Sequence, residues 1–309
     1  MNDFTVEAIG LTRLYGGREA VSNVSFNLSK GQVLGFLGPN GAGKSTTMKM
    51  LTGNLAPSNG SVKICGIDMM ENPKEAKALI GYLPEMRPLY KELTVDEYLT
   101  IAARLHRVSG AHIKKAVELA KERCGLGHMS KRLIENLSNG YQQRVGIARS
   151  LVVEPDLWFL DEPFSALDPL IRREMQDEFI RLQNILKKTI VFITHDFDEA
   201  IRLADRIAVM KDGKIEQIAT PEELVQNPKT DYVADFTRHV ARAKVIRAQS
   251  RMDPVTSDRF AGEVAHDATI EDIADAVERA DAPLKVMKDG KVIGQITART
   301  VIDVLVGRG

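Results

Sequence analysis

Two kinds of hydrophobic pattern alternate along the chain. Short runs rich in β-branched residues, such as "FTVEAI" and "AVSNVSF" near the start and "TIVFITHD" later, predict strands. Segments with apolar residues three and four positions apart, such as "TVDEYLTIAARLHR" and "AHIKKAVELAKER", predict amphipathic helices. Thr94, with Glu97 three positions later, has the pattern of a capping box at the start of the first of these helices. This alternation indicates an α/β fold with a mainly parallel sheet covered by helices.

Turn and cap signals organise the second half of the chain. "DPLIRREMQDEFIRLQNILKK" predicts a helix capped by Asp168, with Pro169 at its first position. "IAVMKDGKIEQIA" predicts a hairpin around Asp212 and Gly213, and "TPEELVQNP" predicts a short capped helix. Further along, "QSRMDPVTSDRF" has the composition of a linker, and the tail beyond it predicts a helix, two short strands and a last helix.

These patterns divide the chain into three parts. We expect a large α/β domain at residues 1–236, a linker at 237–262 and a small α/β module at 263–309. The sequences "MKDGKI" and "MKDGKV" recur in the large domain and the small module, but shared hairpin chemistry explains them better than a repeat architecture.

Composition and charge narrow the choice of partners. The 309 residues include 42 Lys plus Arg and 42 Asp plus Glu, so no bulk attraction to nucleic acid or to anionic lipid is expected. The two cysteines lack metal-ligand or disulfide spacing, which suits a reducing compartment. The N-terminus lacks the signal-peptide pattern, and no apolar run approaches the ~20 residues that span a bilayer. Work at a membrane would therefore require docking onto a protein that crosses it.

The segment "GPNGAGKS" carries the clearest chemistry. It matches a phosphate-binding loop placed between a predicted strand and a predicted helix, whereas the alternative is a glycine turn with an incidental lysine. Backbone N–H groups of such a loop face phosphate oxygens, Lys44 adds a cation, and Ser45 offers a hydroxyl to Mg²⁺. We therefore expect a nucleoside triphosphate to contact Gly38, Pro39, Asn40, Gly41, Ala42, Gly43, Lys44, Ser45 and Thr46.

Three further polar residues follow predicted strands. Asp161 ends the apolar run "LWFLD" and can hold Mg²⁺, because strand ends and the phosphate loop meet at one edge of a parallel sheet. Glu162, one position further, is the natural general base to orient an attacking water. His195 closes "TIVFITH" and would reach the γ-phosphate. The alternatives are a solvated strand end for the acidic pair and a structural role for the histidine.

The order of these motifs over roughly residues 4–236 resembles the nucleotide-binding subunit of the ATP-binding cassette (ABC) transporters. The family pattern has an aromatic residue at Tyr15, the phosphate loop, a "GYLPE" loop ending at Glu85, a signature "LSNGYQQR", "FLDEP", a "SALD" loop and a histidine. The resemblance implies a P-loop cassette with an antiparallel β edge and a helical subdomain at about 86–150. It also implies ATP and Mg²⁺ as cofactors, with Glu85 accepting Mg²⁺-bound water and Tyr15 stacking on the purine. A half-buried strand tyrosine is the alternative for Tyr15.

The same resemblance implies a second copy of the chain as a partner. In this family two subunits pair head to tail, so Ser138 and Gly140 would cover the ATP held by the other copy, and Asp168 of the "SALD" loop would lie at the same site. Simple helix capping by Ser138 is the alternative. Two departures are visible, since Asn139 and Tyr141 stand where the family usually has glycine and glutamine. Serine and the second glycine are retained, so an active site is still expected.

The substrate prediction depends on which half of the chain is considered. The first half, through "LSNGYQQR", resembles ATPases of exporters for drugs, lipids or polysaccharides. The second half, with "FSALDPLIRREMQDEFIRLQ" and "NPKTDYVADFTRHVARAKVI", resembles ATPases that import choline, glycine betaine and proline, with an apparent join near residues 138–159. In that importer family the tail carries modules like those of cystathionine β-synthase (CBS), and the tail here is similar to one of them.

The importer interpretation is preferred because the tail is the rarer feature and adds an entire domain. It implies a permease subunit and a substrate-binding protein as partners, and a peripheral position on the cytoplasmic face of the cell membrane. An exporter ATPase with a foreign tail is the first alternative. A non-transport ABC ATPase is disfavoured by the neutral charge and the lack of a basic arm, which also argue against a nucleic-acid partner. A nucleotide sensor with little turnover and a tail that only mediates dimer contacts also remain as alternatives.

Overall fold

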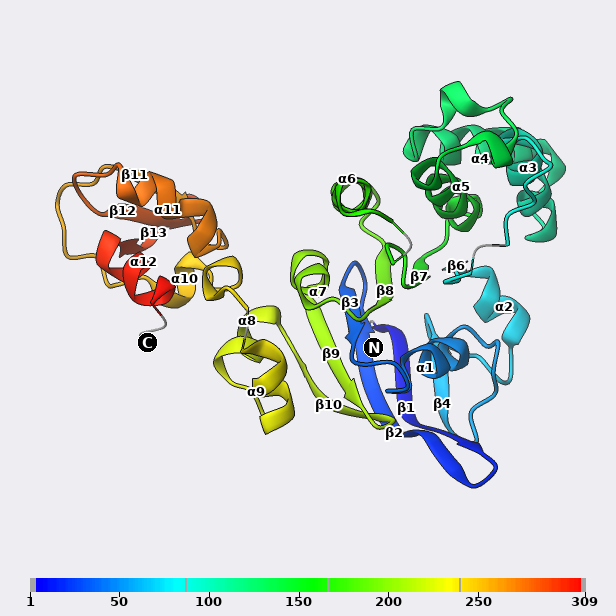
Figure 1. Ribbon diagram of the computed structural model, residues 1–309, viewed down its shortest axis with the longest axis horizontal. Helices are drawn as coiled ribbons and strands as arrows, with labels where there is room; N and C mark the ends of the chain where they lie inside the picture. Colours follow the sequence, from blue (N-terminus) through cyan, green and yellow to red (C-terminus); the bar gives the residue numbers. More distant parts are fainter. Residues whose placement is uncertain (1–3, 87, 166, 239, 307–309) are drawn as a thin grey trace. The chain divides into compact units, whose positions relative to one another are not determined.

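A computed structural model describes residues 4–86, 88–165, 167–238 and 240–306 (Figure 1). The chain divides into two compact units, the first ending at Ile218 and the second beginning at Ala219. Helices α8 (Pro221–Gln226) and α9 (Asp231–Thr237) thus belong to the second unit, although the sequence places the end of the nucleotide-binding domain at 236. The functional boundary stays a prediction. Parts of the predicted domains, at 1–3, 87 and 307–309, and residue 166 of the "SALD" loop lie outside the described residues.

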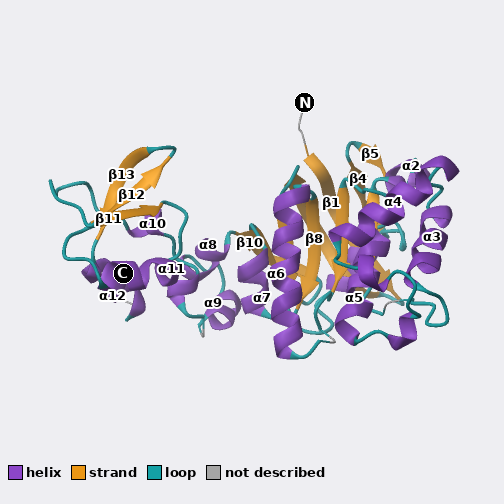
Figure 2. Cartoon of the chain, turned by 90° about the horizontal axis from the view of Figure 1, so that it is seen from above, coloured by secondary structure: helices purple, strands orange, loops and turns teal. Residues whose placement is uncertain are grey.

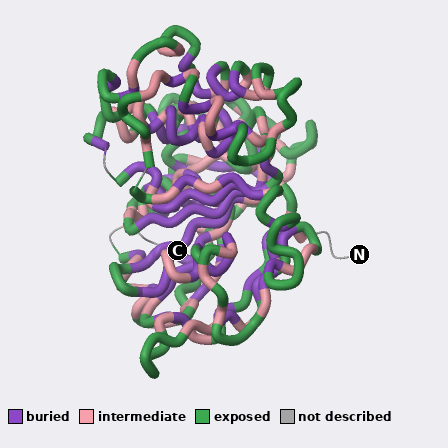
Figure 3. The backbone as a smooth tube through the Cα atoms, turned by 90° about the vertical axis from the view of Figure 1, so that its right-hand side faces the viewer, coloured by how far each residue is buried: buried purple, intermediate pink, exposed green. Residues whose placement is uncertain are grey.

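A six-stranded sheet forms the centre of the first unit, in the order β10-β9-β3-β8-β7-β6. Strand β3 pairs in parallel with β8 and β9, and β7 pairs in parallel with β6 and β8. Every residue of β3, β7 and β8 is buried, as expected for parallel strands covered on both faces (Figure 3). The strands are β3 (Val33–Leu37), β6 (Ile80–Leu83), β7 (Leu157–Asp161), β8 (Thr189–Thr194), β9 (Arg206–Lys211) and β10 (Lys214–Ala219). The predicted mainly parallel sheet is confirmed.

An antiparallel sheet of four strands, in the order β2-β1-β4-β5, accompanies the first. Apolar residues of β1 and β2, among them Leu11 and Leu28, pack with Phe36 of β3 and Met48 of the first helix in one core. Strands β1 and β2 therefore pack against the helix that follows the phosphate loop. The elements are β1 (Phe4–Tyr15), β2 (Arg18–Ser29), β4 (Asn59–Ile64), β5 (Ile67–Asp68) and α1 (Lys44–Leu51).

A group of helices forms the subdomain that the resemblance implied, visible at the upper right of Figure 1. Its helices are α3 (Val95–Leu105), α4 (Gly110–Arg123) and α5 (Asn139–Leu151), with short 3-10 turns at Gly127–Met129 and Ile134–Asn136. The predicted capping box at Thr94 and Glu97 is confirmed. Buried Lys121 joins the helices, because its ammonium lies 2.6 Å from Asp96 and 2.8 Å from Glu118.

Three more helices complete the first unit. They are α2 (Pro73–Ala78), α6 (Pro169–Leu186) and α7 (Phe197–Leu203). Figure 2 shows α6 and α7 beside the strands of the six-stranded sheet. Asp168 caps α6, accepting a hydrogen bond of 3.1 Å from the N–H of Ile171, as the sequence predicts. Nowhere in the described ranges is a helix both long and apolar enough to span a bilayer.

The second unit has its own core around a three-stranded sheet, in the order β11-β12-β13. The sequence predicted α11, β12, β13 and α12, but not β11, because its four residues carry almost no apolar signal. Residues of the predicted linker also enter this core: Ala243, Ile246 and Ala248 are buried against Ile270. The linker is therefore partly folded. The remaining elements are a 3-10 turn at Arg242–Lys244, α10 (Ala248–Arg251), β11 (Gly262–Ala265), α11 (Ile270–Glu278), β12 (Leu284–Lys288), β13 (Lys291–Ile296) and α12 (Ala298–Leu305).

Candidate functional site

The loop between β3 and α1 is built on close backbone approaches. Gly38 has a φ of 155°, and a Cβ placed there would lie 2.3 Å from the carbonyl oxygen of Met210. Gly43, with a φ of 98°, would place a Cβ 2.7 Å from the carbonyl of Ala20. No side chain fits at either position, so glycine is required for the loop to pass between its neighbours. The loop then delivers the chain to the N-terminus of α1, where free N–H groups favour an anion.

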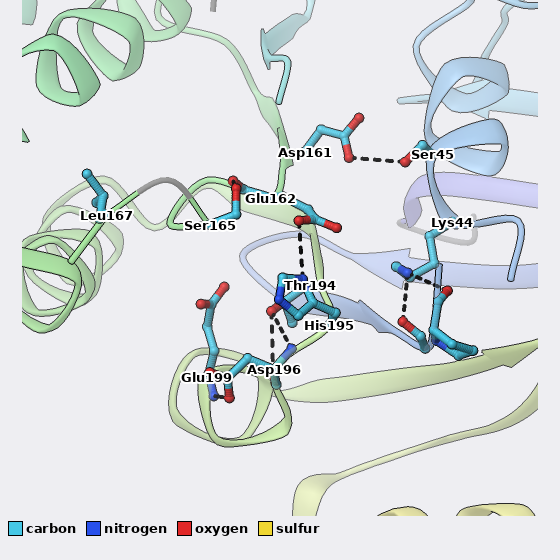
Figure 4. Close-up of polar contacts among 12 residues, drawn as sticks. Lys44, Ser45, Asp161, Glu162, Ser165, Leu167, Thr194, His195, Asp196 and Glu199 are labelled. Carbon is cyan, nitrogen blue, oxygen red and sulfur yellow. Dashed lines mark hydrogen bonds and ion pairs between the residues drawn. The ribbon is translucent and has the colours of Figure 1, made fainter. Parts of the chain in front are cut away.

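Lys44 lies across this loop. Its Nζ donates hydrogen bonds to the carbonyl oxygens of Gly38 at 2.7 Å and Pro39 at 2.9 Å. Burial lowers the pKa of Lys44, while the negative charges of Glu162 and Asp161 act in the opposite direction. The ammonium is therefore held at the loop, next to the space that an anionic ligand would occupy (Figure 4).

Asp161 and Ser45 face one another from different elements. Asp161 ends β7 and is only 4% exposed, and its Oδ1 accepts a hydrogen bond of 3.4 Å from the hydroxyl of Ser45. Burial raises the pKa of Asp161 to about 6, with further contributions from the charges of Glu85 and Glu162. Burial and neighbouring negative charges disfavour the ionised form of this carboxyl, so a cation bound beside it would stabilise the carboxylate strongly.

The donor set suits a magnesium ion better than a metal held entirely by protein. Within the part of the chain that the structure describes, no group of three His, Cys, Asp or Glu side chains is arranged to hold a metal. Mg²⁺ commonly uses one or two protein oxygens together with phosphate oxygens and water. The facing oxygens of Ser45 and Asp161 fit that mode of binding.

Glu162 and His195 form the second contact of the site. His195 Nδ1 lies 3.2 Å from Glu162 Oε2, and the histidine side chain is 58% exposed whereas that of Glu162 is 15% exposed. Glu162 has a φ of 46°, a left-handed conformation that is unusual for a residue other than glycine. Its N–H donates to the carbonyl of Ile193, and its own carbonyl accepts from the hydroxyl and the N–H of Ser165. This turn aims the carboxylate toward His195.

A cavity of about 1120 Å³ connects these groups. Its lining includes eight of the predicted residues of the phosphate loop and the catalytic set. It also includes Tyr15, half exposed with the guanidinium of Arg13 4.8 Å from its ring, and the exposed Glu85. The residues that line it are Tyr15, Arg18, Glu19, Ala20, Asn40, Gly41, Gly43, Lys44, Ser45, Thr46, Glu85, Glu162, His195, Asp212 and Gly213.

The sequence prediction missed five of these lining residues. Arg18, Glu19 and Ala20 follow Tyr15 at the turn from β1 to β2, and Asp212 with Gly213 forms the predicted turn from β9 to β10. The hairpin itself was predicted, but its position beside the phosphate loop was not. Two hydrogen bonds bring these distant turns together. Gly213 N–H donates to the carbonyl of Ala42, and Ser22 N–H donates to the carbonyl of Gly213.

Ser138, Gly140 and Asp168 lie outside this cavity. Ser138 is the N-cap residue of α5, but its side chain makes no capping hydrogen bond. The plain capping role that was the alternative for Ser138 is thus not seen. Gly140 lies against α6, since a Cβ there would be 2.9 Å from Ile171 Cγ2. The first turns of α5 and α6 are therefore neighbours, and Ser138 and Asp168 are both exposed.

Comparison with known proteins agrees with this geometry. Residues 21–165 match the family model described as "ABC transporter". The trimethylamine N-oxide transport system ATP-binding protein TmoW of Pelagibacter ubique is 43% identical over 296 residues, 93% of this chain and 86% of that protein. The choline transport ATP-binding protein OpuBA of Bacillus subtilis is 36% identical over 299 residues, 93% of this chain and 76% of that protein.

A solved structure extends the likeness to the fold. The dimeric ATP-binding cassette MJ0796, in a post-hydrolysis state bound to ADP and phosphate, is 28% identical with a TM-score of 0.62, covering 70% of this chain and 98% of that one. The alignments with TmoW and OpuBA run through both halves of the sequence, across the region where an exporter-like half seemed to join an importer-like half. With most of the phosphate loop, Glu162 and His195 lining one cavity, and Asp161 facing Ser45 beside it, the chain belongs to the ABC transporter family, as an ATP-binding ATPase subunit.

Proposed function

We propose that this ATPase energises the import of a small trimethylated-amine osmolyte, the class that includes glycine betaine, choline and trimethylamine N-oxide. Proline, which the importer branch of the family also takes, is the other expected substrate. The observation that carries the proposal is the length of the alignments: relatives named for trimethylamine N-oxide and for choline transport each match 93% of this chain. Both named compounds carry three methyl groups on one nitrogen.

We assign the site residues roles that their positions support. The backbone N–H groups of the phosphate loop and the ammonium of Lys44 bind the phosphates, and Tyr15 at the rim of the cavity stacks on the adenine. Ser45 and Asp161 would hold Mg²⁺, and Glu85 would accept a hydrogen bond from a water on the ion. Mg²⁺ held there would supply positive charge beside the phosphates.

Glu162 and His195 carry the hydrolysis step. The Glu162 carboxylate accepts a proton from the water that attacks the γ-phosphate, and His195 holds a γ-phosphate oxygen. Their contact at 3.2 Å keeps each side chain oriented at the wall of the cavity. The bond to the leaving ADP breaks as the bond from the water oxygen forms, so no covalent intermediate on the protein is needed.

A second copy of the chain completes the site. In a head-to-tail dimer, Ser138 and Gly140 contact the γ-phosphate of the ATP held by the other copy, and Asp168 lies at the same junction. The exposed Ser138 hydroxyl, which caps no amide of its own helix, supports this role, as does the dimeric cassette among the solved structures. The N-terminus of α5 then presents its free N–H groups to the phosphate.

The other partners are a membrane permease that transmits dimer closure and a binding protein that delivers the osmolyte. The chain would sit peripherally on the cytoplasmic face of the cell membrane. We assign the module at 263–309 a CBS-like regulatory role, which its own core and its strand, helix, strand, strand and helix order support. No nucleic-acid partner is proposed, given equal numbers of acidic and basic residues.

The proposal is tested by transport. Cells that express the chain together with the permease encoded beside it should accumulate radiolabelled choline or trimethylamine N-oxide. Glu162→Gln, which keeps the shape of the side chain but removes the base, should abolish uptake, while the exposed Glu71→Gln should leave it unchanged. Labelled osmolyte leaving preloaded cells instead would support the exporter alternative. Absence of both uptake and efflux for every trimethylated amine would refute the substrate class.

A further inference from the structure

The helix that begins at Ser138 makes a buried polar contact with the segment after Glu162. Gln143 lies five positions into α5 and is 3% exposed. Its side-chain amide donates a hydrogen bond to the carbonyl oxygen of Pro163. Pro163 has no N–H of its own, so this carbonyl is the polar main-chain group that it presents. The contact thus ties the first turns of α5 to the residue next to the proposed general base.

The segment that receives this hydrogen bond needs external support. Glu162 holds a left-handed backbone with a φ of 46°, which is unfavourable for a residue with a Cβ. Ser165 satisfies the Glu162 carbonyl from within the same turn. Gln143 donates to the turn from a different element, α5. Its hydrogen bond therefore makes the position of the turn depend on the position of α5, whereas the Ser165 contacts act only within the turn.

Helix α5 also contacts the neighbouring helices α4 and α6. Arg144, the next residue, donates a hydrogen bond of 3.1 Å to the Cys124 carbonyl at the end of α4 and lies 3.6 Å from Glu178 of α6. Gly140 touches Ile171 closely enough that a Cβ would be 2.9 Å from it. A displacement at the start of α5 would therefore be passed on to the turn at 162–165 instead of being absorbed locally.

We propose that Gln143 is a positioning residue that couples engagement of Ser138 to the orientation of Glu162 in the same chain. In the dimer, the ATP held by one copy contacts Ser138 of the other, and the Gln143 hydrogen bond adjusts Glu162 there for the second ATP. Each site thereby senses the occupation of its counterpart. This inference rests on the proposed dimeric ATPase, and adds to it a path between the two nucleotides.

Two substitutions at Gln143 separate this role from simple packing. Gln143→Met keeps the length of the side chain but removes the donor. Gln143→His restores a donor, because Nε2 of the neutral ring can carry the proton. We expect Gln143→Met to lower kcat about tenfold with less than a twofold change in KM, as expected for one lost positioning hydrogen bond, and Gln143→His to recover most of the loss.

A second measurement excludes a smaller active fraction as the cause. In a Glu162→Gln background, Gln143→Met should trap the same amount of ATP per chain in a dimer, because nucleotide binding and closure do not use this hydrogen bond. Equal kcat in wild type and Gln143→Met, or equal loss in the Met and His variants, would overturn the proposal. So would a parallel fall in trapped ATP, since Gln143 would then act on folding or closure.

The proposed function fails in a distinguishable way. If the unmodified chain hydrolysed no ATP and formed no ATP-dependent dimer with Glu162→Gln, the dimeric ATPase itself would be refuted. A normal wild type with an unaffected Gln143→Met variant would refute the coupling path alone.

Discussion

The imidazole Nδ1 of His195 lies 3.2 Å from a carboxylate oxygen of Glu162, so the two side chains assigned to hydrolysis are joined directly. A carboxylate accepts hydrogen bonds, which places a proton of the ring on Nδ1. The contact therefore orients the imidazole, with Nδ1 toward Glu162 and the opposite ring nitrogen, Nε2, left for the ligand.

Removing the imidazole should uncouple this pair. We expect His195→Ala to lower kcat by ~100-fold or more while the affinity for ATP changes little, because phosphate binding rests on the loop and Lys44. Single-turnover hydrolysis and equilibrium binding of a fluorescent ATP analogue would measure the two effects. Hydrolysis at the wild-type rate would show that His195 is dispensable.

Lys44→Ala should act on binding instead. Loss of a charge-assisted contact costs about 1.5–3 kcal/mol, which corresponds to a ten- to hundredfold weaker affinity for ATP. The same equilibrium titration checks this value. A matched substitution, Lys49→Ala, removes an exposed lysine of the same helix and should bind ATP as tightly as the wild type. Equal affinities for the wild type and Lys44→Ala would contradict the assignment of Lys44 to the phosphates.

Ser138→Arg should block hydrolysis without preventing ATP binding by one chain, because the added side chain would fill the space meant for the partner's nucleotide. Ser109 provides a close control, since it is also an exposed N-cap serine without a capping side-chain hydrogen bond, at the start of α4. Ser109→Arg should retain the ATPase rate of the purified wild type. Steady-state hydrolysis and gel filtration with ATP distinguish the two. Similar behaviour of both variants would remove the trans contact from the mechanism.

Glu199 should make the stability of the first unit depend on pH. The residue is 6% exposed, and burial raises its pKa to about 7, with the Asp196 charge adding to the effect. A carboxyl whose pKa rises on folding is favourable when protonated, so stability is lost as pH rises from about 4.5 to about 7.

Glu199→Gln removes the buried charge and should expose this effect. We expect it to unfold at the same denaturant concentration as wild type at pH 4.5, and to be more stable at pH 8 by on the order of 2–3 kcal/mol. Urea titrations at the two pH values measure the difference. Glu71→Gln, at an exposed carboxyl, should show no such change. A gain that is equal at both pH values would contradict the assignment.

Much of the site could be predicted because it depends on strand ends. Asp161, Glu162 and His195 follow apolar runs long enough to be buried parallel strands, and such strands end at a common edge. The capped helices at Asp168 and at Thr220 were predicted for a similar reason, since a cap is a local hydrogen bond.

Other features were beyond the sequence because they depend on distant contacts. Arg18 and Asp212 line the cavity only because two turns, distant in sequence, lie together at the phosphate loop. No local sequence pattern predicts that contact. The left-handed Glu162 is set by its surroundings rather than by its own preference, which disfavours positive φ. Strand β11 lacks an apolar alternation, and it exists because β12 offers it a parallel neighbour.

The unused hydroxyl of Ser138 bears on local order as well as on chemistry. A helix whose first N–H groups lack acceptors frays more easily, and at α5 the Ser138 side chain accepts no hydrogen bond from them. A phosphate from another molecule would supply those acceptors and finish the secondary structure of α5. Amide exchange at residues 139–142 should then slow when the dimer closes on ATP, so that the nucleotide acts as a shared structural part of two chains.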